Sequence, residues 1–173
     1  MATTLNEKVA KAQRWASKLP ERPNPYVDLR SCPTAWRNGI LRWHGHAYRR
    51  LPFIGDLTIR HDPRAEHAAQ YADRTITFRT APTRKTFFHE LGHHVDRSIP
   101  LNLWPWFAPG RYQRWYKKAA GLKGSWSQTT KSHRVNPRER FAEAVVAALT
   151  NGRGLIITPT KRELKLVRAL LRG

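Results

Sequence analysis

Residues 86–97 read Thr-Phe-Phe-His-Glu-Leu-Gly-His-His-Val-Asp-Arg, and the interpretation of the whole chain starts from this stretch. It contains the pattern His-Glu-x-x-His as His89, Glu90 and His93. Side chains four residues apart project from the same face of an α-helix, so the two imidazoles can bind one metal ion from successive turns. Glu90 would then lie beside them, within reach of a water molecule on that ion. The stretch therefore predicts a helical metal site with an adjacent carboxylate.

The residues around this motif favour a helix. Thr83 can cap its amino end, and Pro100 is expected to lie beyond its carboxyl end. Apolar side chains recur at helical spacing, at Phe87, Leu91 and Val95. Gly92 costs about 1 kcal/mol relative to Ala in a helix interior. We therefore expect another part of the chain to need the space that a side chain at Gly92 would fill.

Two other interpretations of the motif compete with a metal site. The pattern can arise by chance, or the two histidines can be partly buried and hydrogen-bonded to neighbours. Even with the eight histidines of this chain, a chance match to the full pattern is uncommon. The position of the pattern on a credible helix further favours the metal site.

Length and composition indicate a single domain, and the strand and helix patterns along the chain predict the α+β class. The chain has 173 residues, 40% of them hydrophobic, which is enough to bury a core. We expect an amino-terminal helix and Pro-rich connector over 1–25. A single domain over 26–173 should be mostly helical, with a short, partly antiparallel sheet beside the motif helix. Cys32 is the one cysteine, so an internal disulfide is excluded.

The chain also lacks an apolar signal core and any run long enough to cross a bilayer. We expect a protein without a signal peptide or transmembrane segment. Its expected location is the cytoplasm or a nucleoprotein or virion assembly.

The chain is strongly basic. It carries 32 Lys and Arg against 12 Asp and Glu, a formal net charge of +20. Such a field attracts nucleic acid and other polyanions. The basic residues are spread along the chain, which does not indicate sequence-specific reading of bases.

Periodicity predicts the remaining elements. Helices are expected over 5–19, 111–120, 136–151 and 160–172, the last one basic, and strands over 57–61 and 74–79. Weaker signals suggest a short helix or turn within 27–54, a helical turn over 66–71, a Trp- and Pro-rich wall over 101–107 and a loop over 121–134. His44 and His46 stand two residues apart on an expected loop, which is a weak metal-binding signal.

A third metal ligand has to come from outside the motif helix, because a catalytic zinc usually has three protein ligands. The position six residues after His93 is Ile99, which argues against the metzincin pattern. The helix expected over 136–151 carries Glu139 and Glu143, four residues apart and therefore on one face. Either glutamate can instead serve locally, Glu139 in a capping box and Glu143 in a salt bridge.

Two motifs together resemble a known family. His-Glu-Leu-Gly-His-His-Val-Asp at 89–96 and Glu-Arg-Phe-Ala-Glu-Ala at 139–144 are similar to the anthrax lethal factor-like domain, whose family includes Pro-Pro endopeptidases. The resemblance implies a glutamate-type zincin with zinc bound by His89, His93 and Glu139. It makes Glu90 the general base, lets Glu143 support a zinc-bound histidine and lets Asp96 orient the site. By the same likeness to zincins, residues 75–79 would form the edge strand that pairs with substrate.

The chain departs from this family at one position. The family has a Tyr shortly before its glutamate ligand to stabilise the oxyanion, and residues 131–138 contain none. His133 is the nearest substitute, and Tyr112 or Tyr116 could reach in from the preceding helix. ImmA/IrrE-type proteins are a looser match, because their second motif comes sooner after the first.

The resulting expectation is a zinc-dependent metallopeptidase that hydrolyses a peptide bond with a zinc-bound water activated by Glu90. Its partners would be a protein or peptide substrate, and nucleic acid or another polyanion. Two alternatives stay open. One is a non-catalytic basic protein that binds a polyanion, and the other is a degenerate zincin that serves as a structural component of a phage or mobile-element assembly.

Overall fold

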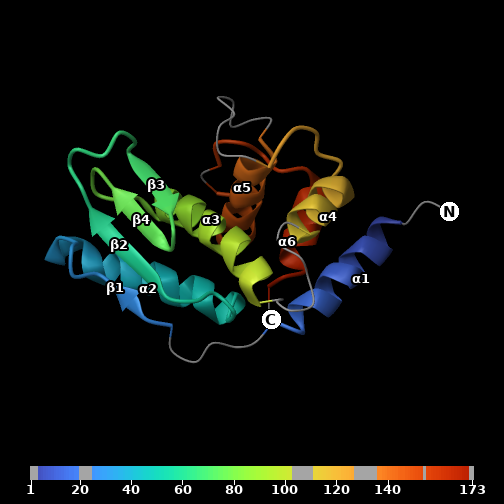
Figure 1. Ribbon diagram of the computed structural model, residues 1–173, viewed down its shortest axis with the longest axis horizontal. Coiled ribbons are helices and arrows are strands. Elements are labelled where there is room, and N and C mark those ends of the chain that lie inside the picture. The colour runs from blue at the N-terminus through green and yellow to red at the C-terminus, as the bar shows by residue number, and fades with distance from the viewer. Residues whose placement is uncertain (1–3, 20–24, 103–110, 127–135, 154, 172–173) are drawn as a thin grey trace.

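The computed structural model describes residues 4–19, 25–102, 111–126, 136–153 and 155–171. These residues form an α+β fold that is mostly helical, as expected, with six helices and a four-stranded mixed sheet (Figure 1). The helices are α1 (Leu5–Ala16), α2 (Thr34–Arg50), α3 (Arg84–Asn102), α4 (Arg111–Ala120), α5 (Pro137–Thr150) and α6 (Lys161–Arg168). The strands are β1 (Val27–Asp28), β2 (Leu57–His61), β3 (Ala69–Ala72) and β4 (Thr75–Phe78).

The sheet lies beside α2 and α3, while α5, α4, α6 and α1 lie on the other side of α3 (Figure 1). Its strand order is β1-β2-β4-β3, with β1, β2 and β4 parallel and β3 antiparallel to β4. None of the helices in the described residues is long and apolar enough to cross a membrane. The Trp- and Pro-rich segment expected over 101–107 falls almost entirely outside the described residues.

Two expectations about the sheet are wrong. Residues 66–71, expected as a helical turn, contribute to strand β3. Asp73 and Arg74 both have positive φ, 43° and 64°, and form the two-residue turn of a β3–β4 hairpin. This turn lacks the glycine that usually marks it in a sequence. Strand β4 is then paired on both sides, so the edge strands are β1 and β3, and residues 75–79 do not form an edge.

Helix α2 is longer than the short helix or turn expected within 27–54. It runs for 17 residues and carries His44 and His46, so the expectation that these histidines lie on a loop is wrong. Its start has no side-chain cap, since Pro33 holds the capping position, and its interior includes Gly39 and Gly45. Weak caps and interior glycines hide a helix in the sequence, and here burial of one face against the core stabilises it.

The motif helix α3 is confirmed. Thr83 caps it, since its Oγ1 accepts a hydrogen bond from the Thr86 N–H at 3.1 Å. The expected apolar face, Phe87, Leu91 and Val95, is fully buried. The helix extends to Asn102, so the expectation that Pro100 lies beyond its end is wrong.

The helices expected in the last third of the chain are also confirmed. Asn136 caps α5 by accepting a hydrogen bond from the Arg138 N–H, and Asn151 ends that helix in the left-handed conformation. Thr160 and Glu163 form a capping box at the start of α6. Helix α1 packs on α6, and its Trp15 contacts the rings of Tyr112 and Trp115 on α4.

Gly92 is the point at which α3 and α5 come closest to each other. A Cβ atom added to Gly92 would lie 2.7 Å from the Cα of Ala142, a distance that real Cβ atoms essentially never show, and 3.0 Å from its Cβ. This close approach explains why a glycine is accepted in the middle of α3. It also sets the distance between the motif histidines and the glutamates of α5.

The substitution Gly92→Ala should therefore destabilise the protein, although Ala is the better helix former. Separating two packed helix backbones typically costs about 1–3 kcal/mol, and a lower denaturation midpoint in urea would measure it. Gly45→Ala is the matched control, since Gly45 also lies inside a helix but has no atom closer than 4.0 Å to an added Cβ. It should raise the free energy of unfolding by up to about 1 kcal/mol. Equal effects of the two substitutions would contradict the close-packing argument.

Candidate metal centre

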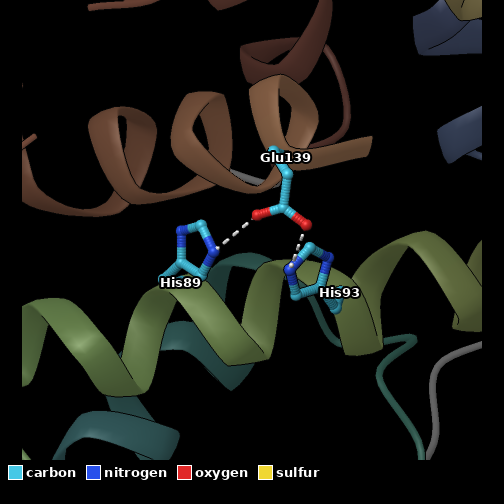
Figure 2. A group of neighbouring side chains, drawn as sticks. All are labelled: His89, His93 and Glu139. Atoms are coloured by element: carbon cyan, nitrogen blue, oxygen red, sulfur yellow. Dashed lines mark hydrogen bonds and ion pairs between the residues drawn. The ribbon is translucent and has the colours of Figure 1, made fainter. Parts of the chain in front are cut away.

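Three side chains from two helices converge between α3 and α5. His89 and His93 project from successive turns of α3, with ring centroids 5.0 Å apart, and Glu139 faces them from the first turn of α5 (Figure 2). The Nε2 of His89 lies 3.0 Å from Glu139 Oε2, and the Nε2 of His93 lies 3.4 Å from Glu139 Oε1. Among the residues that the structure describes, this is the one group whose ligand atoms all lie within 4.8 Å of one another.

The spacing and chemistry of these atoms fit a zinc ion. Zinc bound to nitrogen and oxygen at about 2.0–2.1 Å in tetrahedral geometry separates its ligand atoms by roughly 3.3 Å. The Nε2 atoms of His89 and His93 lie at similar separations, 3.0 and 3.4 Å, each from a different oxygen of the Glu139 carboxylate. A set of two histidines and one glutamate is also one that catalytic zinc uses. The residues therefore fit a divalent metal ion such as zinc.

Glu143 supports His89 from behind. Its Oε1 accepts a hydrogen bond from the Nδ1 of His89 at 2.8 Å. Its Oε2 accepts from the backbone N–H groups of Ile156 and Ile157, at 3.0 and 3.4 Å. With Nδ1 occupied as a donor, the Nε2 of His89 is the nitrogen that faces Glu139, which is how a carboxylate orients a metal-binding histidine.

Burial and hydrogen bonding act in opposite directions on the pKa values of this cluster. Burial lowers the pKa of His89, but hydrogen bonds to Glu139 and Glu143 outweigh burial and raise it to about 10. Burial raises the pKa of Glu139, but its bonds to His89 and His93 hold it well below the usual range. Burial, with smaller contributions from the charges of His89 and Arg138, lowers the pKa of His93 despite its contact with Glu139. The two carboxylates thus remain ionised around a position that favours a cation.

Glu90 follows His89 on α3 and is almost fully buried, with 7% of its surface exposed. Its negative charge is close enough to contribute to the raised pKa of His89. A carboxylate that follows a candidate ligand on the motif helix and acts electrostatically on it is in the position expected of a general base.

Asp96 lies where α3, α4 and α5 meet. Its carboxylate accepts hydrogen bonds from Gln113 Nε2 and Trp126 Nε1, both at 3.1 Å, and forms an ion pair with Arg138 at 3.6 Å. Arg138 immediately precedes Glu139, so Asp96 is tied to the metal centre through the start of α5. No spacing or motif in the sequence points to Gln113, Trp126 or Arg138 as its partners.

The two tyrosines considered as oxyanion donors, Tyr112 and Tyr116, are not brought to the site. Tyr112 and Tyr116 are fully buried, and their rings pack against Phe141. Neither hydroxyl has a hydrogen-bond partner among the described residues. Both tyrosines belong to the core and do not reach in as expected. His133 lies outside the described residues.

Three other histidines, His44, His46 and His94, contact groups of the protein core and do not join the cluster. His44 is buried and stacks on Tyr48, and the Nε2 of His46 lies 3.1 Å from the carbonyl oxygen of Leu149. His94, which follows the motif, contacts the hydroxyl of Tyr71 through Nδ1 at 3.1 Å and the carbonyl of Gly55 through Nε2 at 3.2 Å. His94 therefore links α3 to the edge strand β3.

Comparison with known proteins identified no relative of this chain. The chain matches no protein-family model, and it matches neither a curated protein nor a solved structure. Any functional conclusion consequently rests on the geometry and chemistry of the site.

The purified protein should contain about one equivalent of zinc or a similar divalent metal per chain, measured by inductively coupled plasma mass spectrometry. His89→Ala and Glu139→Ala should each lose most of the metal, because two ligands do not hold zinc tightly in water. His67→Ala removes an exposed histidine outside the site and serves as the control. Full metal content in both site variants would show that the cluster is not a metal centre.

Glu143→Gln should weaken zinc binding by about 10–100-fold, because a neutral amide is a poorer hydrogen-bond acceptor for His89 than a carboxylate. Competition with a chromophoric chelator measures the affinity. Glu66→Gln changes an exposed glutamate and should leave the affinity unaltered. Identical zinc affinities for wild type and Glu143→Gln would contradict the proposed role of Glu143 in orienting His89.

Proposed function

We propose that this protein is a zinc-dependent metallopeptidase. The observation that carries the proposal is the convergence of His89, His93 and Glu139 within metal-binding distance, with the carboxylate of Glu90 beside them on α3. The resemblance of residues 89–96 and 139–144 to the anthrax lethal factor-like family supports the same roles. Hydrolysis of a peptide bond is the reaction for which this combination of groups is suited.

Each residue of the site has a separate role in the proposed reaction. A zinc ion at this site would act as a Lewis acid on the scissile carbonyl and make a water molecule more acidic. Glu90 takes the proton from the attacking water and delivers it to the leaving nitrogen. Glu143 keeps the imidazole of His89 in one orientation through its 2.8 Å hydrogen bond. Because the ligands stand on two packed helices, the site is preorganised.

Strand β3 is where we place the peptide substrate. It is the edge of the sheet next to α3, to which Tyr71 and His94 connect it. An extended peptide can pair with the backbone of such an edge strand. This placement brings the substrate alongside the helix that carries Glu90.

Glu90→Gln is the substitution that tests catalysis. It should retain zinc, because Glu90 is not among the three ligands, and lose hydrolysis by about a hundredfold or more, because Gln cannot accept the proton. Cleavage of a mixed peptide library, followed by mass spectrometry, measures activity on many sequences at once and does not require a single chosen substrate. Glu66→Gln is the matched control.

Two outcomes would overturn the proposal. One is peptide cleavage by Glu90→Gln at the wild-type rate. The other is a zinc-loaded wild-type protein that cleaves nothing in the library or in candidate partner proteins, which would favour a degenerate zincin with a structural role.

A further inference from the structure

Basic residues occur along the whole chain, but the acidic residues that accompany them are unevenly distributed. Residues 111–126 and 155–171, which contain α4 and α6, carry nine basic residues and one acidic residue, Glu163. Glu163 is fully buried and paired with Arg140, so it does not offset the exposed charge. Residues 25–80 also carry nine basic residues, but five carboxylates accompany them.

Five of these basic residues gather where α4 ends and α6 begins. The guanidinium Nη1 of Arg162 would lie 3.3 Å from a Cβ added at Gly121, so the first turn of α6 abuts the end of α4. The Nζ of Lys117 donates a hydrogen bond to the carbonyl of Gly124 at 2.9 Å. Figure 1 shows the two helices side by side, and they are in contact. We call this group the α4–α6 basic patch; its members are Lys117, Lys118, Lys123, Lys161 and Arg162.

The stability of α6 does not explain this charge. The amino end of a helix carries a partial positive charge, so cations there are unfavourable by a few tenths of a kcal/mol to about 1 kcal/mol each. Lys161 and Arg162 nevertheless occupy the first turn of α6 and are exposed. Glu163, the acidic residue of that turn, points inward. The exposed basic residues are therefore placed against the helix dipole, which suits a surface that meets an external anion.

The side chains around the patch indicate which class of anionic partner it would bind. Among the described residues, the exposed large hydrophobic side chains are those of Tyr26, Leu41 and Ile156, and none of these three lies on α4 or α6. Single-stranded nucleic acids are usually held by exposed aromatic rings on which bases stack, and membrane-surface helices insert apolar side chains. Helices α4 and α6 present exposed basic side chains and no exposed large hydrophobic side chain among the described residues. Basic side chains of this kind can pair with the closely spaced phosphates of a duplex.

We propose that the α4–α6 basic patch binds double-stranded DNA through its phosphates, without reading its bases. The patch shares no residue with the metal centre, so the proposal stands independently of the peptidase function. Its energy comes from release of counterions from the phosphates, which makes binding steeply dependent on salt.

The test compares two fourfold variants with equal net charge. Lys118→Gln, Lys123→Gln, Lys161→Gln and Arg162→Gln together neutralise the patch, leaving Lys117 and its hydrogen bond in place. Arg42→Gln, Arg49→Gln, Arg60→Gln and Arg64→Gln together neutralise four exposed arginines on α2, on β2 and just after β2. Each variant removes four charges from the +20 of the wild type. Circular dichroism and thermal unfolding check that both are folded.

Fluorescence anisotropy with a labelled DNA duplex of about 20 base pairs and mixed sequence measures affinity over roughly 50–200 mM NaCl. The patch variant should bind at least about tenfold more weakly, and its slope of log affinity against log salt should fall by about 0.9 for each phosphate that the protein no longer neutralises. The control variant should show less than about a third of that effect. Glu90→Gln and chelator-treated protein should bind the duplex like the wild type, which separates this proposal from the metallopeptidase one.

Three results would overturn the proposal. Equal losses of affinity in the two fourfold variants would show that binding depends on the net charge of the protein and not on the patch. Tighter binding of the corresponding single strand than of the duplex would assign the patch to single-stranded nucleic acid. Stronger retention by vesicles that contain phosphatidylserine than by the duplex would assign it to a membrane surface.

Discussion

The close approach of α3 and α5 at Gly92 and Ala142 is the constraint on which the site depends. Gly92 lies between His89 and His93 along α3, and Ala142 lies between Glu139 and Glu143 along α5. The close packing of the two helices around these residues presents both glutamates to the histidines at hydrogen-bonding distance. A side chain at Gly92 would push the helices apart, and the candidate metal ligands with them. Gly92 thus determines both how closely α3 and α5 pack and how close the histidines lie to the glutamates.

Four acidic residues of this basic protein are buried or partly buried around this contact. They are Glu90, Asp96, Glu139 and Glu143, and a buried carboxylate is unfavourable unless a cation or hydrogen-bond donors compensate it. His89 and His93 compensate Glu139, while His89 and two backbone amides compensate Glu143. Asp96 is compensated by Arg138, Trp126 and Gln113. The region is arranged to hold positive charge inside the fold, whereas the exposed positive charge of α4 and α6 faces outward.

The differences between the expected and observed structure have specific physical origins. Strand β3 is hidden in the sequence because its hairpin turn uses Asp73 and Arg74 at positive φ, where glycine or asparagine is the usual signal. Without β3, the edge of the sheet falls on the wrong strand. Helix α2 is equally hard to recognise, because Pro33 gives it no side-chain cap and two glycines lie inside it. Tyr112 and Tyr116 have the chemistry of oxyanion donors, but their aromatic neighbours hold them in the core.

Local periodicity and residue chemistry were enough to predict the donor types, the helical spacing of His89 and His93, the caps of α3 and α5, and the α+β class. They left the roles of Glu139 and Glu143 to resemblance, since two residues four apart share a helix face and look alike in one dimension. The tertiary structure alone separated their positions. Glu139 faces both Nε2 atoms, whereas Glu143 reaches the Nδ1 of His89. That difference arises from the relative placement of two helices that are about 50 residues apart in the sequence.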